Sequence, residues 1–222
     1  MTNVSFADQL DIFDPEKWGW PIHVIGLGGI GSSLLLPLVK LGVRDVHIWD
    51  DDNVEAHNVP AQLLYRTSDV GQSKVSAAAS IIDSYGMNVT IHQHERWVTP
   101  STKLEGVVMS GVDKMSSRRM IWEAVKYNPQ VPLYVDGRIG AEKVQVLTVD
   151  PVDAESIGSY EPWLLSDEDV ADLPCSARTI IHSPLQVATW MIAQLTLHAR
   201  GELPREMVFS NLREMQYVIG AR

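Results

Sequence analysis

A glycine-rich stretch near the N-terminus has the spacing of a phosphate-binding loop. Gly26, Gly28 and Gly31 satisfy the pattern G-x-G-x-x-G, and Gly29 adds a fourth glycine. Glycines at these positions let backbone N–H groups approach a nucleotide phosphate at the start of a helix. Asp50 follows Gly31 by 19 residues, the distance at which a carboxylate accepts hydrogen bonds from ribose hydroxyls. The spacing therefore indicates nucleotide binding, although a tight turn without a ligand would contain the same glycines.

These residues require a strand, a turn and a helix to position them. Residues 22–27 form a short apolar run with β-branched side chains, and residues 30–41 have helical periodicity. Residues 45–50 form a second strand-like run. Because a helix-sized segment separates the two runs, the pattern predicts a right-handed βαβ crossover and a parallel sheet. Pro37 is expected to bend or interrupt the helix.

Strands and helices continue to alternate along the chain. Further helices are predicted at residues 72–85, 116–126 and 176–200, and further strands at 88–92, 106–110, 132–136, 143–149, 207–210 and 216–219. The pattern predicts an α/β, Rossmann-like, mostly parallel sheet with helices on both faces and an antiparallel extension toward the C-terminus. We expect one domain in four parts: an N-terminal arm (1–21), a nucleotide-binding core (22–150), a crossover loop with at most short helices (151–175), and a C-terminal helix with a terminal hairpin (176–222).

Composition narrows the class of protein. The chain has 222 residues and a formal net charge of −10, which argues against a nucleic-acid partner. Its one cysteine, Cys175, permits neither an intrachain disulfide nor a four-cysteine zinc site. Residues 1–20 lack the pattern of a secretory signal, and residues 180–199 contain too many polar groups to span a membrane. We therefore expect a cytoplasmic protein with a small-molecule or protein substrate.

A longer motif begins at the end of the second predicted strand. Residues 50–54 read D-D-D-N-V, Asn58 and Gln62 follow, and residues 69–74 read D-V-G-Q-S-K, ending at Lys74. This pattern resembles the ThiF/MoeB family and the adenylation domains of ubiquitin-activating enzymes, in which approximately D-x-D-x-V-x-x-x-N-x-x-R-Q is followed by D-V-G-x-x-K. The resemblance covers about residues 22–200, and its combined spacing is more specific than the glycine loop alone.

The resemblance implies a function and a partner. It implies a homodimer that uses ATP and Mg²⁺ to adenylate the C-terminal glycine of a ubiquitin-like or sulfur-carrier protein with a Gly-Gly tail. Lys74 would neutralise phosphate charge, since adenylation requires a cation to stabilise the charge that develops on the phosphates. The implied nucleotide-binding residues are Gly26, Gly28, Gly29, Gly31, Asp50, Asp52, Asn58, Gln62 and Lys74.

Asp113 and Arg118 extend the resemblance. Asp113 follows the predicted strand 106–110, where the family has an aspartate that binds Mg²⁺. Arg118 matches a family arginine five residues beyond that aspartate. A carboxylate at a strand end would point into the ligand crevice of an open α/β sheet. The alternative role of Asp113 is to cap the helix that follows.

Cys175 lies just before the last predicted helix, where the family often places an acyl-accepting cysteine. Such a thiol would take the activated acyl group as a thioester or take part in acyl-persulfide chemistry. A lone cysteine is also compatible with a buried, inert role. Both interpretations remain open at this stage.

The chain also departs from the family pattern. Ala61 stands where an arginine is expected, Lys114 replaces a common asparagine, and no arginine precedes Arg44, although related homodimers supply an N-terminal arginine across the subunit interface. Arg66 or Arg138 would have to substitute, and we include Arg66 with Lys74, Asp113 and Cys175 among the candidate catalytic residues.

These departures favour one alternative, a non-catalytic adenylation-like module that binds nucleotide or a partner. An NAD-dependent dehydrogenase would explain only the glycine loop and Asp50. A relative acting on a carboxylate of tRNA is disfavoured by the net charge of −10. His92 and His94 are spaced as strand neighbours on one face, but no motif completes a metal site around them, so exposed strand histidines are the favoured interpretation.

Overall fold

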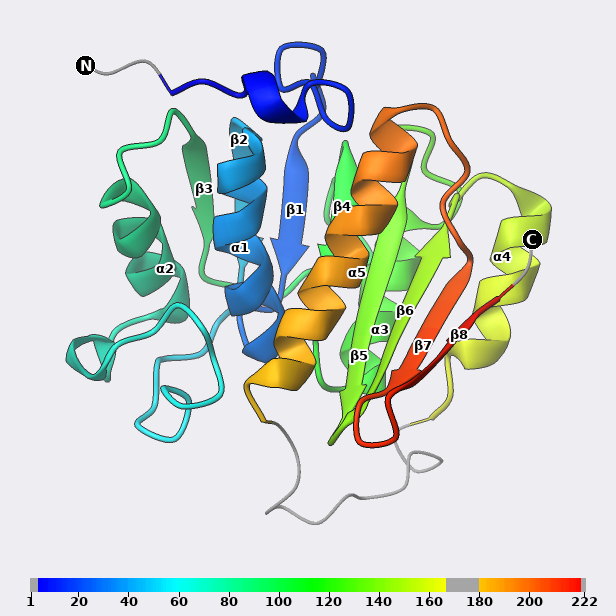
Figure 1. Ribbon diagram of the computed structural model, residues 1–222. Helices are drawn as coiled ribbons and strands as arrows, with labels where there is room; N and C mark the ends of the chain where they lie inside the picture. The colour runs from blue at the N-terminus through cyan, green and yellow to red at the C-terminus, as the bar shows by residue number, and fades with distance from the viewer. Residues whose placement is uncertain (1–3, 167–179, 221–222) are drawn as a thin grey trace.

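The computed structural model describes residues 4–166 and 180–220 (Figure 1). Its centre is an eight-stranded sheet in the order β3-β2-β1-β4-β5-β6-β7-β8. The first five strands in the chain are parallel: β1 (Ile22–Ile25), β2 (Asp45–Trp49), β3 (Thr90–His94), β4 (Val107–Ser110) and β5 (Tyr134–Gly140). The last three pair antiparallel: β6 (Lys143–Val149), β7 (Met207–Asn211) and β8 (Gln216–Ile219). The predicted fold class is confirmed.

Helices cover both faces of this sheet (Figure 1). One face carries α1 (Gly29–Leu41), α2 (Lys74–Asp83) and α5 (His182–Ala199), and the other carries α3 (Met115–Val125) and α4 (Ala154–Tyr160). Short 3-10 helices occur at η1 (Ala7–Gln9), η2 (Thr67–Asp69) and η3 (Glu161–Trp163). The predicted crossover segment thus contains α4 and η3 in its described part. The predicted start of the last helix, residues 176–179, lies outside the described residues.

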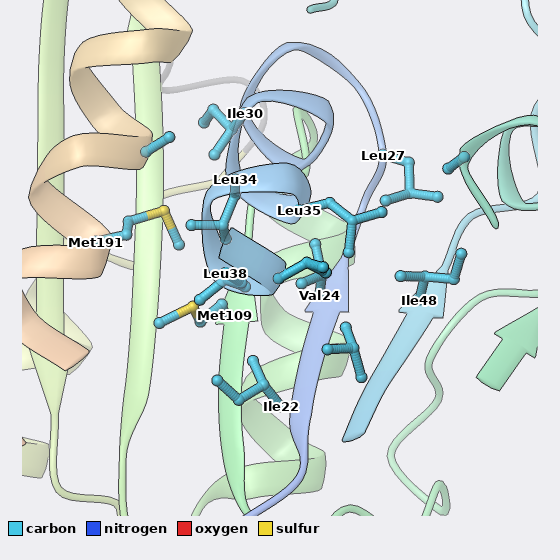
Figure 2. Packing of buried hydrophobic residues seen from close by; sticks show 14 of the residues in the cluster. Ile22, Val24, Leu27, Ile30, Leu34, Leu35, Leu38, Ile48, Met109 and Met191 are labelled. Atoms are coloured by element: carbon cyan, nitrogen blue, oxygen red, sulfur yellow. The ribbon is translucent and has the colours of Figure 1, made fainter. Parts of the chain in front are cut away.

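The hydrophobic core covers both faces of the sheet at β1, whose four residues are all buried. Ile22 and Val24 face α1 and contribute to the cluster that includes Leu34, Leu38 and Met191 (Figure 2). Successive strand residues point to opposite faces, so Ile25 instead belongs to a second cluster with residues of α3.

α1 is one continuous helix from Gly29 to Leu41 despite Pro37, so the interruption expected there does not occur. Leu34, Leu35 and Leu38, which lie on both sides of Pro37, are each at most 1% exposed. Packing of these side chains offsets the one backbone hydrogen bond that a proline removes.

The strand order reverses between β1 and β4, because β2 and β3 lie on one side of β1 and β4 to β8 lie on the other. In open α/β sheets, ligands bind outside the carboxyl ends of the strands at such a reversal. The glycine loop follows β1, Asp50 follows β2, and Asp113 lies three residues beyond β4. Among the helices of the described residues, none has the length and apolar character to cross a membrane.

Candidate nucleotide site

The glycine loop turns sharply between β1 and α1. Gly26 has φ +87°, a conformation that favours glycine, and a Cβ at Gly31 would lie 1.9 Å from the Gly26 carbonyl oxygen. A Cβ at Gly28, by contrast, would meet nothing within 4 Å. The internal packing therefore requires glycine at 26 and 31, whereas Gly28 borders open space beside the first turn of α1. The first-turn N–H groups of a helix have no intrahelical partner and favour an anion there.

Asp50 connects the end of β2 to this loop. Its carboxylate is 4% exposed and accepts hydrogen bonds from the N–H of Leu27 at 2.6 Å and from the N–H of Asp52 at 2.9 Å. Burial raises the pKa of Asp50, and the positive charge of Lys74 opposes that rise. Each oxygen retains a further acceptor position for a ribose hydroxyl.

Lys74 reaches this edge because two parts of the motif pair with each other. The Val54 N–H donates to the Gln72 carbonyl, the Gly71 N–H donates to the Val54 carbonyl, and the Lys74 N–H donates to the Asp52 carbonyl, all within 3.0 Å. Residues 52–54 thereby hold the start of α2 against the end of β2. This contact explains why the two motif segments belong together although 14 residues separate Val54 from Asp69.

The Lys74 side chain is only 7% exposed and is therefore almost fully buried. Its Nζ donates to Asp52 Oδ2 at 2.7 Å and lies 3.7 Å from Asp50 Oδ1. A buried ammonium group needs such partners, since burial without them is costly. Lys74 therefore supports the local structure as well as supplying positive charge.

The turn after the aspartates folds back over the glycine loop. Asn58 is buried, and its Oδ1 accepts from the Glu55 N–H at 2.9 Å, so it stabilises the turn itself. Gln62 has a buried Oε1 without a hydrogen-bond partner, which is a candidate acceptor for a ligand hydroxyl or amino group. Tyr65 donates its buried hydroxyl to the Leu27 carbonyl at 2.9 Å. The sequence analysis did not identify Tyr65 as a residue of this site. The only signal in the sequence is its position three residues after Gln62 in the motif.

The β4–α3 loop brings Asp113 to the same edge. The positions of Gly111 and Val112 are fixed by the glycine loop, because a Cβ at Gly26 would lie 3.0 Å from Val112 Cγ1 and 3.2 Å from the Gly111 carbonyl oxygen. Asp113 follows directly and is exposed. The residue at the cap position of α3 is Lys114 and makes no side-chain capping bond, so the capping role considered for Asp113 is not observed.

The buried side chain of Arg118 supports the β4–α3 loop from the protein interior. The guanidinium group is buried and donates to the carbonyl oxygens of Val112 and Gly137 and to Asp136. Asp136 is fully buried and also pairs with Arg138 at 2.8 Å. Burial opposes ionisation of Asp136, but the two guanidinium groups hold its pKa below the ordinary value. Arg118 is thus a positioning residue for the segment that carries Asp113.

Arg138 is already engaged as well. Besides pairing with Asp136, the Arg138 guanidinium group donates to the Trp163 carbonyl oxygen at 2.8 Å. The Arg138 side chain is therefore held between β5 and η3. Arg66 is exposed at the start of η2, where its N–H donates to Asp69 at 2.8 Å. Of the two substitutes for the missing arginine, only Arg66 has an exposed side chain. Cys175 lies outside the described residues.

The residues present fit a nucleotide and a magnesium ion. Open space at Gly28, the first turn of α1, buried Asp50 and the unpaired Oε1 of Gln62 offer the groups that phosphates and a ribose require. Asp113 supplies an exposed carboxylate, and the carboxylates of Asp50, Asp51 and Asp52 lie within 4.8 Å of one another. Oxygen donors of this kind suit Mg²⁺.

A comparison with protein-family models matches the ThiF family over residues 20–218. Among curated proteins, the chain is 34% identical over 105 residues to adenylyltransferase and sulfurtransferase MOCS3-2 of Zea mays, covering 45% of this chain and 22% of that protein. It is 32% identical over 125 residues to SUMO-activating enzyme subunit 2 of Dictyostelium discoideum, covering 54% of this chain and 19% of that protein. It is also 30% identical over 142 residues to the NEDD8-activating enzyme E1 catalytic subunit of Saccharomyces cerevisiae, covering 59% and 47%. The matches therefore span less than half of the length of these relatives.

Solved structures agree on the fold. A structure of PaaA matches with a TM-score of 0.73 and 18% identity, covering 93% of this chain and 65% of that chain. The structure of E. coli MccB with ATP matches with a TM-score of 0.72 and 14% identity over the same shares of the two chains. At such low identity, these similarities establish the fold alone.

Proposed function

Because the chain belongs to the ThiF family, we propose that it uses ATP to adenylate a carboxylate. The proposed substrate is the C-terminal glycine of a ubiquitin-like or sulfur-carrier protein with a Gly-Gly tail. One observation carries the proposal: the pairing of residues 52–54 with residues 71–74 brings Lys74 to within 3.7 Å of Asp50, beside the glycine loop. In this arrangement a cation can contact the phosphates of a nucleoside triphosphate while a neighbouring carboxylate contacts its ribose. Binding and activation of the nucleotide require both groups.

The proposed reaction is one displacement at phosphorus. A carboxylate oxygen of the substrate attacks the α-phosphorus, the bond from that phosphorus to the bridging oxygen breaks, and pyrophosphate leaves with the electron pair. The first-turn N–H groups of α1 and the Lys74 ammonium group stabilise the charge that develops on the phosphates. Positioning and charge stabilisation supply the catalysis, so no general base is required.

Lys74 would change partner during this reaction. Its contact with Asp52 is the more exposed of its two ion pairs, because the Asp52 side chain is 60% exposed and that of Asp50 is 4% exposed. A phosphate oxygen would replace Asp52, while Asp50 keeps the ammonium group in place. Asn58 and Gln62 would lie at the triphosphate end, where the side-chain N–H group of Gln62 would donate to a phosphate oxygen, and Arg66 would contribute a second cation.

Asp113 is the proposed ligand of Mg²⁺. When bound, the ion would neutralise part of the negative charge of the phosphates. The role of the chain is to hold that carboxylate at the crevice, through the contact of Gly111 and Val112 with the glycine loop and through Arg118.

The names of the relatives support the choice of substrate. They include NEDD8-activating and SUMO-activating subunits and an adenylyltransferase with sulfurtransferase function. We propose that the Cys175 thiolate then attacks the carbonyl carbon of the acyl-adenylate, so that a thioester bond forms, the bond to the phosphate oxygen breaks and AMP leaves. We also propose that the chain acts as a homodimer.

The test is carrier-dependent exchange of radiolabelled pyrophosphate into ATP, which reports the reversible formation of an acyl-adenylate. Wild-type protein should show exchange that depends on Mg²⁺ and on a carrier ending in Gly-Gly. Lys74→Met should lower the exchange rate about 100-fold, or ~3 kcal/mol, comparable to removing one preorganised donor. Lys126→Met is the matched control, because Lys126 pairs with Glu161 away from the crevice. Cys175→Ser should retain exchange and lose any thiol-sensitive adduct with the carrier.

A second candidate is a nucleotide-binding module without catalysis. Ala61 stands in place of the family arginine, and Arg138, one of the two substitutes considered, is held by Asp136 and the Trp163 carbonyl. This candidate is correct if the wild-type chain binds ATP without exchange and Ala61→Arg introduces exchange.

A further inference from the structure

The register of the first three strands produces a row of histidines. His23 of β1 pairs with His47 of β2, and His47 pairs with His92 of β3. Their side chains lie on one face of the sheet, with ring centroids 4.4 Å apart for His23 and His47 and 4.3 Å apart for His47 and His92. These separations follow from the spacing of neighbouring strands, which is about 4.8 Å. The sequence cannot reveal this row, because its members lie 24 and 45 residues apart.

An aspartate completes the outer end of this row. Asp45 lies two residues before His47 on the same face of β2, and its Oδ1 is 3.1 Å from His92 Nε2 and 3.7 Å from His47 Nε2. In a tetrahedral site with bonds of about 2.0–2.1 Å, the donor atoms lie about 3.3 Å apart. The observed distances lie on either side of that value. The side chains of Asp45 and His92 are 51% and 44% exposed, so both can rotate toward a shared ion.

The His47 ring has a partner on the nitrogen that would not bind the ion, because its Nδ1 lies 3.0 Å from His94 Nε2. When His47 donates through Nδ1, this contact orients the ring and leaves Nε2 unprotonated on the side of Asp45. The His94 ring in turn stacks on Trp49 at 3.7 Å.

We propose that Asp45, His47 and His92 bind one divalent transition-metal ion, with one coordination position open to solvent. Two imidazoles and one carboxylate favour Zn²⁺ over Mg²⁺, which prefers oxygen ligands. His92 lies on β3, the edge strand of the sheet, so the ion would cross-link that edge to β2. These side chains lie on the face opposite α1 and α2, and the proposal does not depend on the adenylation reaction.

The experiment is isothermal titration of ZnCl₂ into the full chain, prepared without a histidine tag and freed of metal by dialysis against a chelator. We expect one Zn²⁺ per chain and a melting temperature that rises with ZnCl₂, because a ligand of the native state stabilises it by mass action. MgCl₂ should give no binding that depends on His92. Co²⁺ bound at the same site should show visible absorption bands of a nitrogen- and oxygen-ligated ion.

Substitutions of single residues identify which side chains bind the Zn²⁺ ion. His92→Ala and Asp45→Asn should each weaken Zn²⁺ binding at least tenfold, and His94→Gln should weaken it about 10–100-fold through the loss of the group that orients His47. His182→Ala is the matched control, because His182 also lies near a carboxylate, 3.6 Å from Glu142, and this substitution should leave binding unchanged. Two exposed ligands are tested separately, so one variant that fails to fold leaves the other informative. Zn²⁺ affinity that is equal in wild type, His92→Ala and Asp45→Asn would overturn the proposal, as would wild-type binding only at millimolar Zn²⁺.

Discussion

At the scale of single residues, Lys74 has a structural role in addition to its proposed role in phosphate binding. It is a buried ammonium group between Asp50 and Asp52, and Asp50 is itself buried at the end of β2. Removing the lysine would leave the Asp50 carboxylate buried without its counter-charge. If Lys74 binds phosphate as proposed, one side chain couples the stability of the site to its affinity for phosphate.

We predict that Lys74→Met lowers the free energy of unfolding by about 1–3 kcal/mol at pH 7, because the buried Asp50 carboxylate loses its counter-charge and keeps only its two backbone N–H donors. The pKa of Asp50 is raised in the folded protein, so the folded state takes up a proton first as the pH falls. The penalty for burying the charge is present above that raised pKa and is relieved as the pH falls through it toward the ordinary value of 3.8. Urea unfolding at several pH values should show the deficit of the variant shrinking on acidification. A deficit that is constant from pH 7 to pH 4.5 would contradict this account of Lys74.

We also predict that two glycines three positions apart in the loop, Gly28 and Gly31, respond differently to substitution by alanine. Gly31→Ala should prevent folding or lower the melting temperature sharply, because its Cβ would meet the Gly26 carbonyl oxygen at 1.9 Å. Gly28→Ala should fold, since its Cβ meets nothing within 4 Å, and should lose stabilisation by ATP because the methyl group occupies the space next to the phosphates. Thermal melts with and without ATP measure both effects. Full ATP stabilisation of Gly28→Ala would place the phosphates elsewhere.

At the scale of elements, the loop after β4 depends on a buried network under it. Arg118 of α3 joins the Val112 carbonyl to Asp136 and to the Gly137 carbonyl of β5. Ser110 at the end of β4 also donates to Asp136 at 3.0 Å. One helix and two strands thereby fix the segment that presents Asp113.

For this network we predict that Arg118→Gln costs about 3 kcal/mol of stability, because breaking a buried ion pair leaves a charge without compensation. The double variant Arg118→Gln with Asp136→Asn should recover part of that loss, since the unpaired carboxylate is removed. The lowered pKa of Asp136 implies that its contribution is present above pH 3.8 and is lost as the pH falls through the folded-state value. Chemical denaturation of the four proteins in this cycle supplies the measurement, and strictly additive losses would show that the two residues do not interact.

At the scale of the whole molecule, the order of the strands brings the segments of the candidate nucleotide site together. The loops after β1, β2 and β4 meet where the strand order reverses, and α2 is held there by its pairing with the segment after β2. A nucleotide bound at this edge would contact segments from four parts of the chain, so its binding should stabilise the fold as a unit.

We therefore predict that ATP with Mg²⁺ raises the melting temperature and that NAD has little effect. At an ATP concentration 100 times its dissociation constant, the stabilisation is about 2.7 kcal/mol. Asp113→Asn should remove the part that depends on Mg²⁺. Stabilisation by NAD but not by ATP would refute the adenylation proposal and favour the dehydrogenase alternative.

A homodimer is the second prediction for the whole molecule. The edge strand β8 exposes Tyr217, Val218 and Ile219 at 68%, 55% and 47%, and an open edge with apolar side chains is suited to pairing with a second chain. Light scattering should give the mass of a dimer at micromolar concentration, and Val218→Glu should shift it toward the monomer. Leu203→Glu, at a position that is 66% exposed outside β8, is the control. A monomeric wild-type chain would contradict the prediction.

Much of this architecture follows from local pattern. The glycine spacing, the apolar runs and the turn residues predicted β1, α1 and β2, because strand and helix periodicity depend on neighbouring residues. The boundaries of β3 were less well predicted, since the structure places it at Thr90–His94 and the pattern suggested residues 88–92. Alternation of exposed and half-buried residues in an edge strand gives only a weak signal.

The sequence by itself determined the fold class and the family, and it predicted a nucleotide-binding role for Gly26, Asp50 and Lys74, because the motif places them at fixed positions along the chain. Only the tertiary structure decided the surroundings of these side chains. It buried Lys74 against two carboxylates, engaged Arg118 and Arg138 with Asp136, and aligned His23, His47 and His92 in one row. Burial, ion pairing and strand register depend on contacts between residues far apart in the chain, and a linear pattern does not encode those distances.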